Sequence, residues 1–118
     1  MVIAGVIIFI IAVILAFTAM KKADINECLS YNDPVTRNLC ISNVSIKYYD
    51  ISVCNLSGDW VACINNYAQH SLNPKICEKL GENAGWCKMN IAIAKNDSSL
   101  CFGLGLLENQ CLQRTIGR

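Results

Sequence analysis

The cysteines of this 118-residue chain recur with a regular period, and this constrains its fold more than any other feature. They form two interleaved series whose successive members are 23 to 26 residues apart: Cys28, Cys54, Cys77 and Cys101, and Cys40, Cys63, Cys87 and Cys111. A fixed period of this length is the signature of a small repeat array. Eight cysteines in so short a chain also indicate a disulfide framework, which persists in an oxidising compartment outside the cytosol.

Each repeat carries signals for two short helices. Four positions before each cysteine of the first series stands an Asp or Asn, whose side-chain oxygen accepts the free N–H groups of a first helical turn. These N-cap candidates are Asp24, Asp50, Asn73 and Asp97, and weaker starts before the second series are Asp33-Pro34, Asp59 and Asn83. The sequence therefore predicts four αα-hairpins, at about residues 24–49, 50–72, 73–96 and 97–118. They must stack, because such a hairpin cannot bury its own apolar face.

The hairpin geometry favours one disulfide pattern. Two residues of an antiparallel hairpin face each other when they are equally far from its turn, which predicts the pairs 28–40, 54–63, 77–87 and 101–111. The rival pattern joins 40 to 54, 63 to 77 and 87 to 101, but leaves an axial offset of about 7 Å between partners, too large for comfortable disulfide geometry. Each predicted loop of about ten residues would contribute roughly 2.5–3 kcal/mol in the chain-entropy model.

An uncharged apolar segment precedes the repeats. Residues 2–20 contain no charge, and their only polar side chain is Thr18. As a helix they would span about 28 Å, close to the hydrocarbon thickness of a bilayer. Because the segment is apolar on every side, it must be buried all round, by lipid or by a bundle of identical helices. Residues 21–30 contain no Gly or Pro, so the first repeat is expected to continue directly from this helix.

Two features bear on how this segment is processed and oriented. A cleaved secretory signal is the alternative to a retained helix, but the basic n-region is missing and the apolar run is longer than usual. Lys21 and Lys22 would lie in the cytoplasm by the positive-inside rule, whereas the cysteines require the opposite side. We give the cysteines priority, which makes the repeats extracytoplasmic. Removal of a basic leader upstream of Met1 would reconcile the two signals.

Chemical function finds little support in the residues. Zinc sites bring cysteines in close pairs, whereas the nearest spacing here is nine, and neither a metal nor another cofactor is expected. The single histidine, His70, is interpreted as an ordinary residue near a helix end, and no catalytic residue is predicted. Ten basic and nine acidic residues without a like-charge run argue against nucleic acid. Trp60 and Trp86 are expected to pack on the disulfides, with exposed binding aromatics as the alternative.

Three N-glycosylation sequons occur: Asn43-Val44-Ser45, Asn55-Leu56-Ser57 and Asn96-Asp97-Ser98. This is a mild excess over chance for an asparagine-rich chain. The pattern is compatible with a glycosylated surface protein. Asn96 stands at a predicted helix start, which is accessible, whereas Asn43 is a plausible acceptor only on the outer face of its helix.

Two resemblances follow from these motifs. The unit Asp-x-x-Leu-Cys, a turn, Cys-x-x-x-apolar-Ala and a further Asp covers residues 24–116 and resembles cysteine-rich helical repeats in uncharacterised predicted surface proteins of archaea. Residues 1–20 resemble the hydrophobic N-terminal helix of archaeal type IV pilin-like proteins. That resemblance implies a cleaved basic leader and a filament core of apolar helices with globular heads outside. Familiar pilin heads are β-rich, whereas this one is predicted to be all helix.

The sequence thus predicts an all-α chain: one long hydrophobic N-terminal helix in residues 1–22, then four disulfide-stapled αα-hairpins in residues 23–118. The expected function is that of a non-enzymatic structural subunit of an extracellular assembly, such as a pilin-like filament, with residues 2–20 as the polymerisation helix. The alternative is a membrane-anchored extracytoplasmic binding module. The expected partners are copies of the chain or a lipid bilayer, with surface glycans. A basic leader encoded upstream of Met1 would favour the filament.

Overall fold

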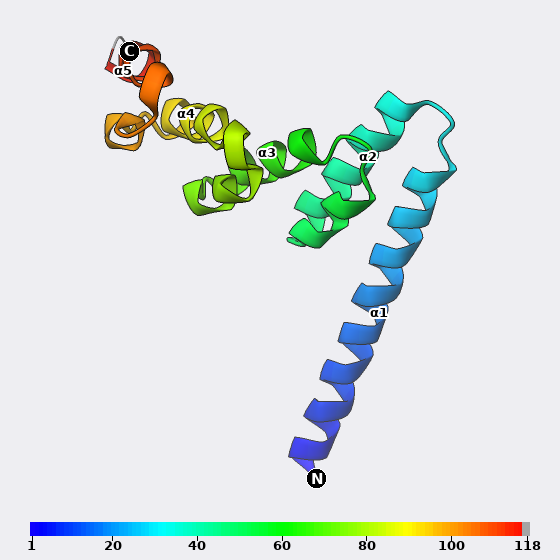
Figure 1. Cartoon of the computed structure of the whole chain (residues 1–118). Coiled ribbons are helices and arrows are strands. Elements are labelled where there is room, and N and C mark those ends of the chain that lie inside the picture. Colours follow the sequence, from blue (N-terminus) through cyan, green and yellow to red (C-terminus); the bar gives the residue numbers. More distant parts are fainter. Residues whose placement is uncertain (117–118) are drawn as a thin grey trace.

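The computed structural model describes residues 1–116 and, over this range, consists of helices joined by short turns (Figure 1). The all-α prediction, with one long apolar helix followed by a disulfide-linked remainder, is confirmed. The α-helices are α1 (Val2–Ser30), α2 (Pro34–Lys47), α3 (Trp60–Ser71), α4 (Ala84–Lys95) and α5 (Glu108–Ile116). The 3₁₀ helices between them are η1 (Ile51–Leu56), η2 (Pro74–Asn83), η3 (Ser98–Cys101) and η4 (Gly105–Leu107).

Helix α1 runs without a break from the apolar segment into the first repeat, as predicted. It ends where Tyr31 becomes extended, just before the turn that leads to Asp33 and Pro34. Asp24 is therefore not an N-cap, and that prediction is wrong. Good helix formers on both sides keep the backbone ladder of α1 intact, so no free N–H group remains at this point to be capped. The carboxylate of Asp24 instead bonds the side chains of Lys47 and Tyr48.

The predicted caps of the second helices are largely present. Asp33 accepts a hydrogen bond from the backbone N–H of Thr36 at the start of α2, and Asp59 accepts one from Ala62 at the start of α3. Asn83 precedes α4 but makes no side-chain capping bond. The backbone of Asn83 is already helical, because the chain makes its turn two residues earlier, at Gly81, where φ is 55°.

The first helices of repeats two to four are 3₁₀ helices, which corrects the prediction of α-helices. Their caps Asp50, Asn73 and Asp97 each accept from the N–H group two residues further on, as in an Asx turn. A 3₁₀ helix rises about 2.0 Å per residue, against about 1.5 Å for an α-helix. Over the four positions from cap to cysteine, the 3₁₀ helix therefore spans a longer distance along its axis than an α-helix would.

Consecutive repeats are joined at equivalent positions by residues in the left-handed conformation. Tyr49, Leu72 and Asn96 each directly precede a cap residue and have φ of 51°, 54° and 53°. Each joint ends one helix and redirects the chain into the next 3₁₀ helix. Asn adopts this conformation readily, whereas a bulky residue such as Tyr or Leu does so at a cost.

The core follows the disulfides along the array. α2 packs against α1 and α3, α3 against α4, and α4 against α5. One cluster of buried residues runs from Cys28 to Ile91, and a second, smaller one lies under the last repeat around Met89 and Cys111. Ala68 and Ala92, one on α3 and one on α4, are both fully buried. The repeats thus form an elongated head, and the N-terminal part of α1 extends away from it (Figure 1).

Candidate functional site: the apolar stem and its junction with the head

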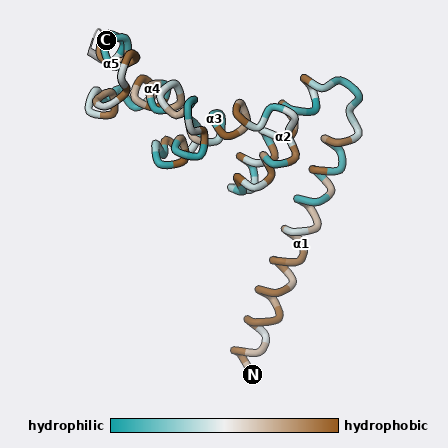
Figure 2. The backbone as a smooth tube through the Cα atoms, in the orientation of Figure 1, coloured by the Kyte–Doolittle hydropathy of each residue, from teal (hydrophilic) through white to brown (hydrophobic). Residues whose placement is uncertain are grey.

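The N-terminal part of α1, residues 2–20, is here called the stem. Each of its side chains is exposed, and Figure 2 shows the hydrophobic character of this part of the helix. Among the helices of residues 1–116, α1 alone is long enough and apolar enough to cross a membrane, and it lies near the N-terminus. Such a surface is far larger than the apolar patches that soluble monomers expose. The stem therefore has to be covered by something outside the chain.

A small set of contacts, here called the junction, fixes the head to the upper end of the stem. The ring of Phe17 meets the ring of Tyr48 edge to face, with centroids 5.0 Å apart. Lys21 Nζ lies 2.9 Å from a carboxylate oxygen of Asp50. One turn further along α1, Asp24 accepts hydrogen bonds from Lys47 Nζ at 2.8 Å and from the Tyr48 hydroxyl at 2.5 Å.

These contacts shift the ionisation of the junction groups. Hydrogen bonds from Lys47 and from the Tyr48 hydroxyl hold the pKa of Asp24 below its ordinary value of 3.8. The bond to Asp24, together with burial, raises the pKa of Tyr48. The pKa of Asp50 is lowered by its bonds from Ser52 and Lys21. The junction is therefore a set of charges and dipoles that satisfy one another, with both carboxylates ionised at neutral pH.

The junction occupies one face of α1 and leaves the opposite face free. Phe17, Lys21, Asp24 and Cys28 follow one another at intervals of four, three and four residues, so they share a face. A line of small side chains lies roughly 140° further round the helix at 100° per residue. It consists of Gly5, Ala12, Ala16, Ala19 and Ala23. This line was not predicted from the sequence, although its regular spacing of seven, four, three and four residues is visible there.

Protein-family models, curated proteins and solved structures were compared with the chain. None of them matches it. The resemblances to archaeal cysteine-rich repeats and to pilin-like helices therefore stay expectations.

The eight cysteines form the four pairs that the hairpin geometry predicts: Cys28–Cys40, Cys54–Cys63, Cys77–Cys87 and Cys101–Cys111. The Cα atoms of the partners are 5.3 to 5.6 Å apart, within the usual range for disulfides. Since every cysteine is oxidised, none is a thiolate nucleophile or metal ligand. No group of three or more His, Cys, Asp or Glu side chains that could hold a metal occurs in the part of the chain described.

The remaining candidate residues lie on the surface. His70 is exposed in the last turn of α3, the place expected of it. Trp60 and Trp86 are 45% and 51% exposed, so about half of each side chain is open to a partner, and the prediction that they pack on the disulfides stays untested. Trp60 is the first residue of α3, and Trp86 lies in the first turn of α4.

All three sequon asparagines are exposed, but their backbones differ. Asn43 lies in the middle of α2, between buried neighbours. Asn55 lies at the end of η1, next to the turn that leads into α3. Asn96 forms the left-handed joint between α4 and η3. The latter two have the surface-turn setting typical of acceptor sites.

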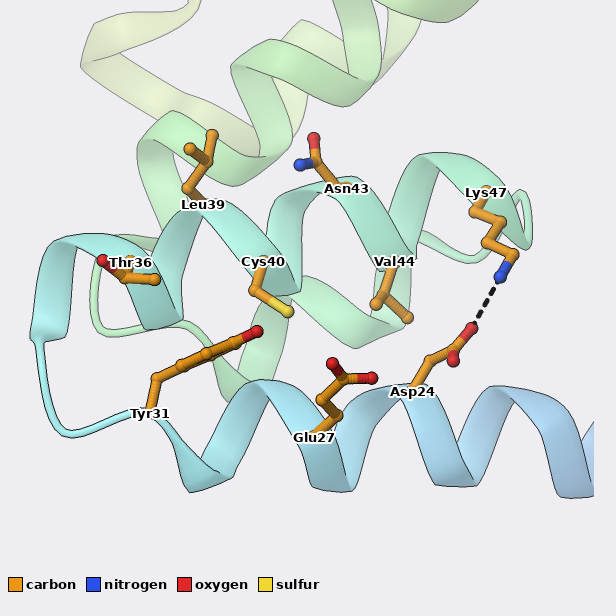
Figure 3. A pocket seen from close by; sticks show the side chains of 9 residues that line it. All are labelled: Asp24, Glu27, Tyr31, Thr36, Leu39, Cys40, Asn43, Val44 and Lys47. Atoms are coloured by element: carbon orange, nitrogen blue, oxygen red, sulfur yellow. Dashed lines mark hydrogen bonds and ion pairs between the residues drawn. The ribbon is translucent and has the colours of Figure 1, made fainter.

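A groove of about 390 Å³ separates the end of α1 from α2. Figure 3 shows Glu27 rising into it from α1, Tyr31 lying across one end, and the Asp24–Lys47 ion pair at the other. Its only sulfur is that of Cys40, which is held in a disulfide. The carboxylates of Asp24 and Glu27, the hydroxyls of Tyr31 and Thr36 and the amine of Lys47 line the groove, and no histidine does. The groove is a surface feature of the junction.

Proposed function

We propose that this chain is a non-enzymatic structural subunit of an extracellular assembly, a filament in which the stems of many copies form the core. Chains that have not assembled are held by the same stem in a bilayer. The observation that carries the proposal is the stem itself, whose every side chain is exposed and which is apolar on all sides. Its length of about 28 Å as a helix suits either covering.

The position of the head supports bundling of the stems. Because the junction lies on one face of α1, the heads of bundled chains can all lie outside, on the sides of the bundle away from its axis. The free face then turns toward the neighbouring stems, and its small side chains allow helix backbones to approach closely. Apolar burial on this scale is the main driving force for association in water.

The head suits an extracytoplasmic coat. Disulfides in all four repeats indicate an oxidising environment. Short loops closed by covalent bonds give a protease few long flexible segments to cleave. We further propose that the surface carries N-linked glycans on one or more of Asn43, Asn55 and Asn96, all of which are exposed.

A membrane-anchored binding module is the second candidate, and one observation favours it. In the head, residues 21–116, eleven large hydrophobic side chains are exposed, and nine of them lie inside the four loops closed by disulfides. The nine are Leu29, Tyr31, Val35, Leu39, Leu56, Trp60, Trp86, Phe102 and Leu106. Apolar side chains gathered in rigid loops are suited to recognising a partner, because little entropy is lost on binding.

Electron microscopy of material sheared from cells without detergent, with this chain identified by mass spectrometry, separates the two functions. Regular filaments that contain the chain support the structural subunit. A chain that stays with the membranes and enters solution only in detergent, as a small species, contradicts it and leaves the anchored module.

A substitution on the free face of the stem tests whether neighbouring stems or lipid bury it. Ala16→Leu places a larger side chain on that face, and we expect it to prevent filament formation by holding neighbouring stems apart, while membrane association is kept because Leu partitions well into lipid. Ala4→Leu, the same change about 100° from the centre of that face, is the matched control and should still assemble. Counting filaments by electron microscopy in cells expressing each variant provides the comparison. Equal assembly of the two variants would contradict close packing through this face.

A further inference from the structure

We propose that the lower edge of the head, residues 47–50, rests on the headgroup layer of the bilayer that holds the stem, with the ring of Tyr49 inserted at the interface. The inference rests on the part of the proposed function that places the unassembled stem in lipid. It adds a second point of contact with the membrane, made by the head.

The junction sets the level of this edge relative to the bilayer. The apolar stem ends at Met20, and Lys21 and Lys22 mark the boundary between hydrocarbon and headgroups. Tyr48 contacts Phe17 below this boundary, and Asp50 is paired with Lys21 at it. Tyr49 stands between these two contact residues in the chain. The edge therefore lies at the depth of the headgroup layer when the stem spans the membrane.

The direction of α2 makes residues 47–50 the edge that faces the membrane. α2 begins near the C-terminal end of α1, runs back alongside it toward the stem, and ends at Lys47 (Figure 1). The turn between α1 and α2 lies at the opposite end, about ten residues or roughly 15 Å further along the axis of α1. The two ends of the first hairpin thus differ strongly in their distance from the bilayer.

The backbone of Tyr49 is strained, and packing of its side chain against the head does not offset that strain. Its φ of 51° is left-handed, a conformation that disfavours bulky side chains, and the two equivalent joints further along the chain use Leu72 and Asn96. The Tyr49 side chain is 81% exposed, so it gains almost no packing within the chain. Strain held at an exposed residue points to a function outside the fold. Tyrosine favours the membrane interface, because its ring is apolar and its hydroxyl polar.

The charges around Tyr49 suit the same partner. At this level of α1 the edge carries two ion pairs, Lys21–Asp50 and Lys47–Asp24, and Lys22 follows Lys21 on another face of the helix, which leaves a net charge of 3 − 2 = +1. Because both carboxylates are already bound to lysines, they present little free negative charge to lipid phosphates. The exposed Lys22 is free to approach them. Lysines next to a membrane span are attracted to anionic headgroups.

Fluorescence quenching in vesicles tests this placement with the full chain. The protein is reconstituted at low density in vesicles of phosphatidylcholine and phosphatidylglycerol, with Trp60→Phe and Trp86→Phe, so that a single introduced tryptophan reports. Tyr49→Trp is the test position, Tyr31→Trp at the far end of the first hairpin is the control, and Val13→Trp reports insertion of the stem. Intact mass confirms that all four disulfides have formed in each variant.

We expect lipids brominated near the ester groups to quench Tyr49→Trp at least two-fold more than Tyr31→Trp, with blue-shifted emission. A quenched Val13→Trp together with a Tyr49→Trp as water-exposed as Tyr31→Trp would overturn the inference, since the stem would then be inserted without the edge touching lipid. Filament formation is scored separately by electron microscopy, so failure here leaves the proposed function standing.

Discussion

Side chains with the same chemistry have different roles in this chain according to the backbone around them. Asp59 begins α3 and accepts a hydrogen bond from the N–H of Ala62, whereas Asp24 lies within α1 and bonds side chains from α2 and the residue after it. Both residues precede a cysteine by four positions. The local pattern identifies a carboxylate suited to capping, but the free N–H groups that it would cap exist only where a helix begins.

Removing the cap of α3 should weaken the second repeat. Asp59→Ala deletes the acceptor of the Ala62 N–H group, and we expect the free energy of unfolding to fall by about 1 kcal/mol. Asp59→Ser keeps a capping oxygen and serves as the control, with a smaller loss. Urea unfolding in detergent micelles, followed by circular dichroism, measures both variants. Equal losses for Ala and Ser would mean that the cap adds nothing to the stability of α3.

At the scale of elements, the contact between α1 and α2 depends on ionised carboxylates. The pKa values of Asp24 and Asp50 are lowered in the folded chain, so their contribution to stability is fully present above the unfolded value of 3.8 and is lost as pH falls through the folded values. Protonated Asp24 would no longer attract Lys47. The junction is therefore expected to be stable at neutral pH and to loosen in acid.

We expect amide hydrogens at the C-terminal end of α2 and around residues 48–50 to exchange faster once pH falls below about 4, after correction for intrinsic rates. Hydrogen exchange with mass spectrometry on the chain in micelles measures this. Asp24→Asn cannot ionise and should already show the faster exchange at pH 7, with a weaker dependence on pH. Protection that is unchanged from pH 7 to pH 3 in the original chain would contradict a role for these charges.

At the scale of the whole molecule, the head is a linear array in which each repeat contacts its neighbours. The disulfide Cys54–Cys63 lies in the large cluster of buried residues shared by several repeats. Cys101–Cys111 lies in the small cluster under the last repeat. In such an array stability is close to a sum of repeat and neighbour contributions, so damage at the end should spread less than damage in the middle.

Removing one disulfide at a time tests this view. The double substitutions Cys54→Ala with Cys63→Ala and Cys101→Ala with Cys111→Ala open loops of nearly equal length, 9 and 10 residues, and each should cost about 2–4 kcal/mol locally. We expect limited proteolysis to release only the last repeat from the second variant, whereas the first should lose protection across several repeats. Cleavage of similar extent in both variants would show that the head unfolds as one cooperative unit.

The sequence by itself determined the helical class, the repeat, the disulfide pattern and the apolar stem. Each depends on information local in the chain: cysteines nine to twelve residues apart across a turn, caps next to the helices they start, and nineteen residues without a charge. Such features need only the geometry of one helix or one hairpin to be interpreted.

Tertiary structure alone decided what depends on contacts between repeats. It placed Asp24 opposite Lys47 and Tyr48, residues 23 and 24 positions away, and paired Lys21 with Asp50 across 29 positions. It also made the first helices of repeats two to four 3₁₀ helices and gave Tyr49 a left-handed backbone. No periodicity in the sequence encodes these distances, since they are set by how one repeat stacks on the next.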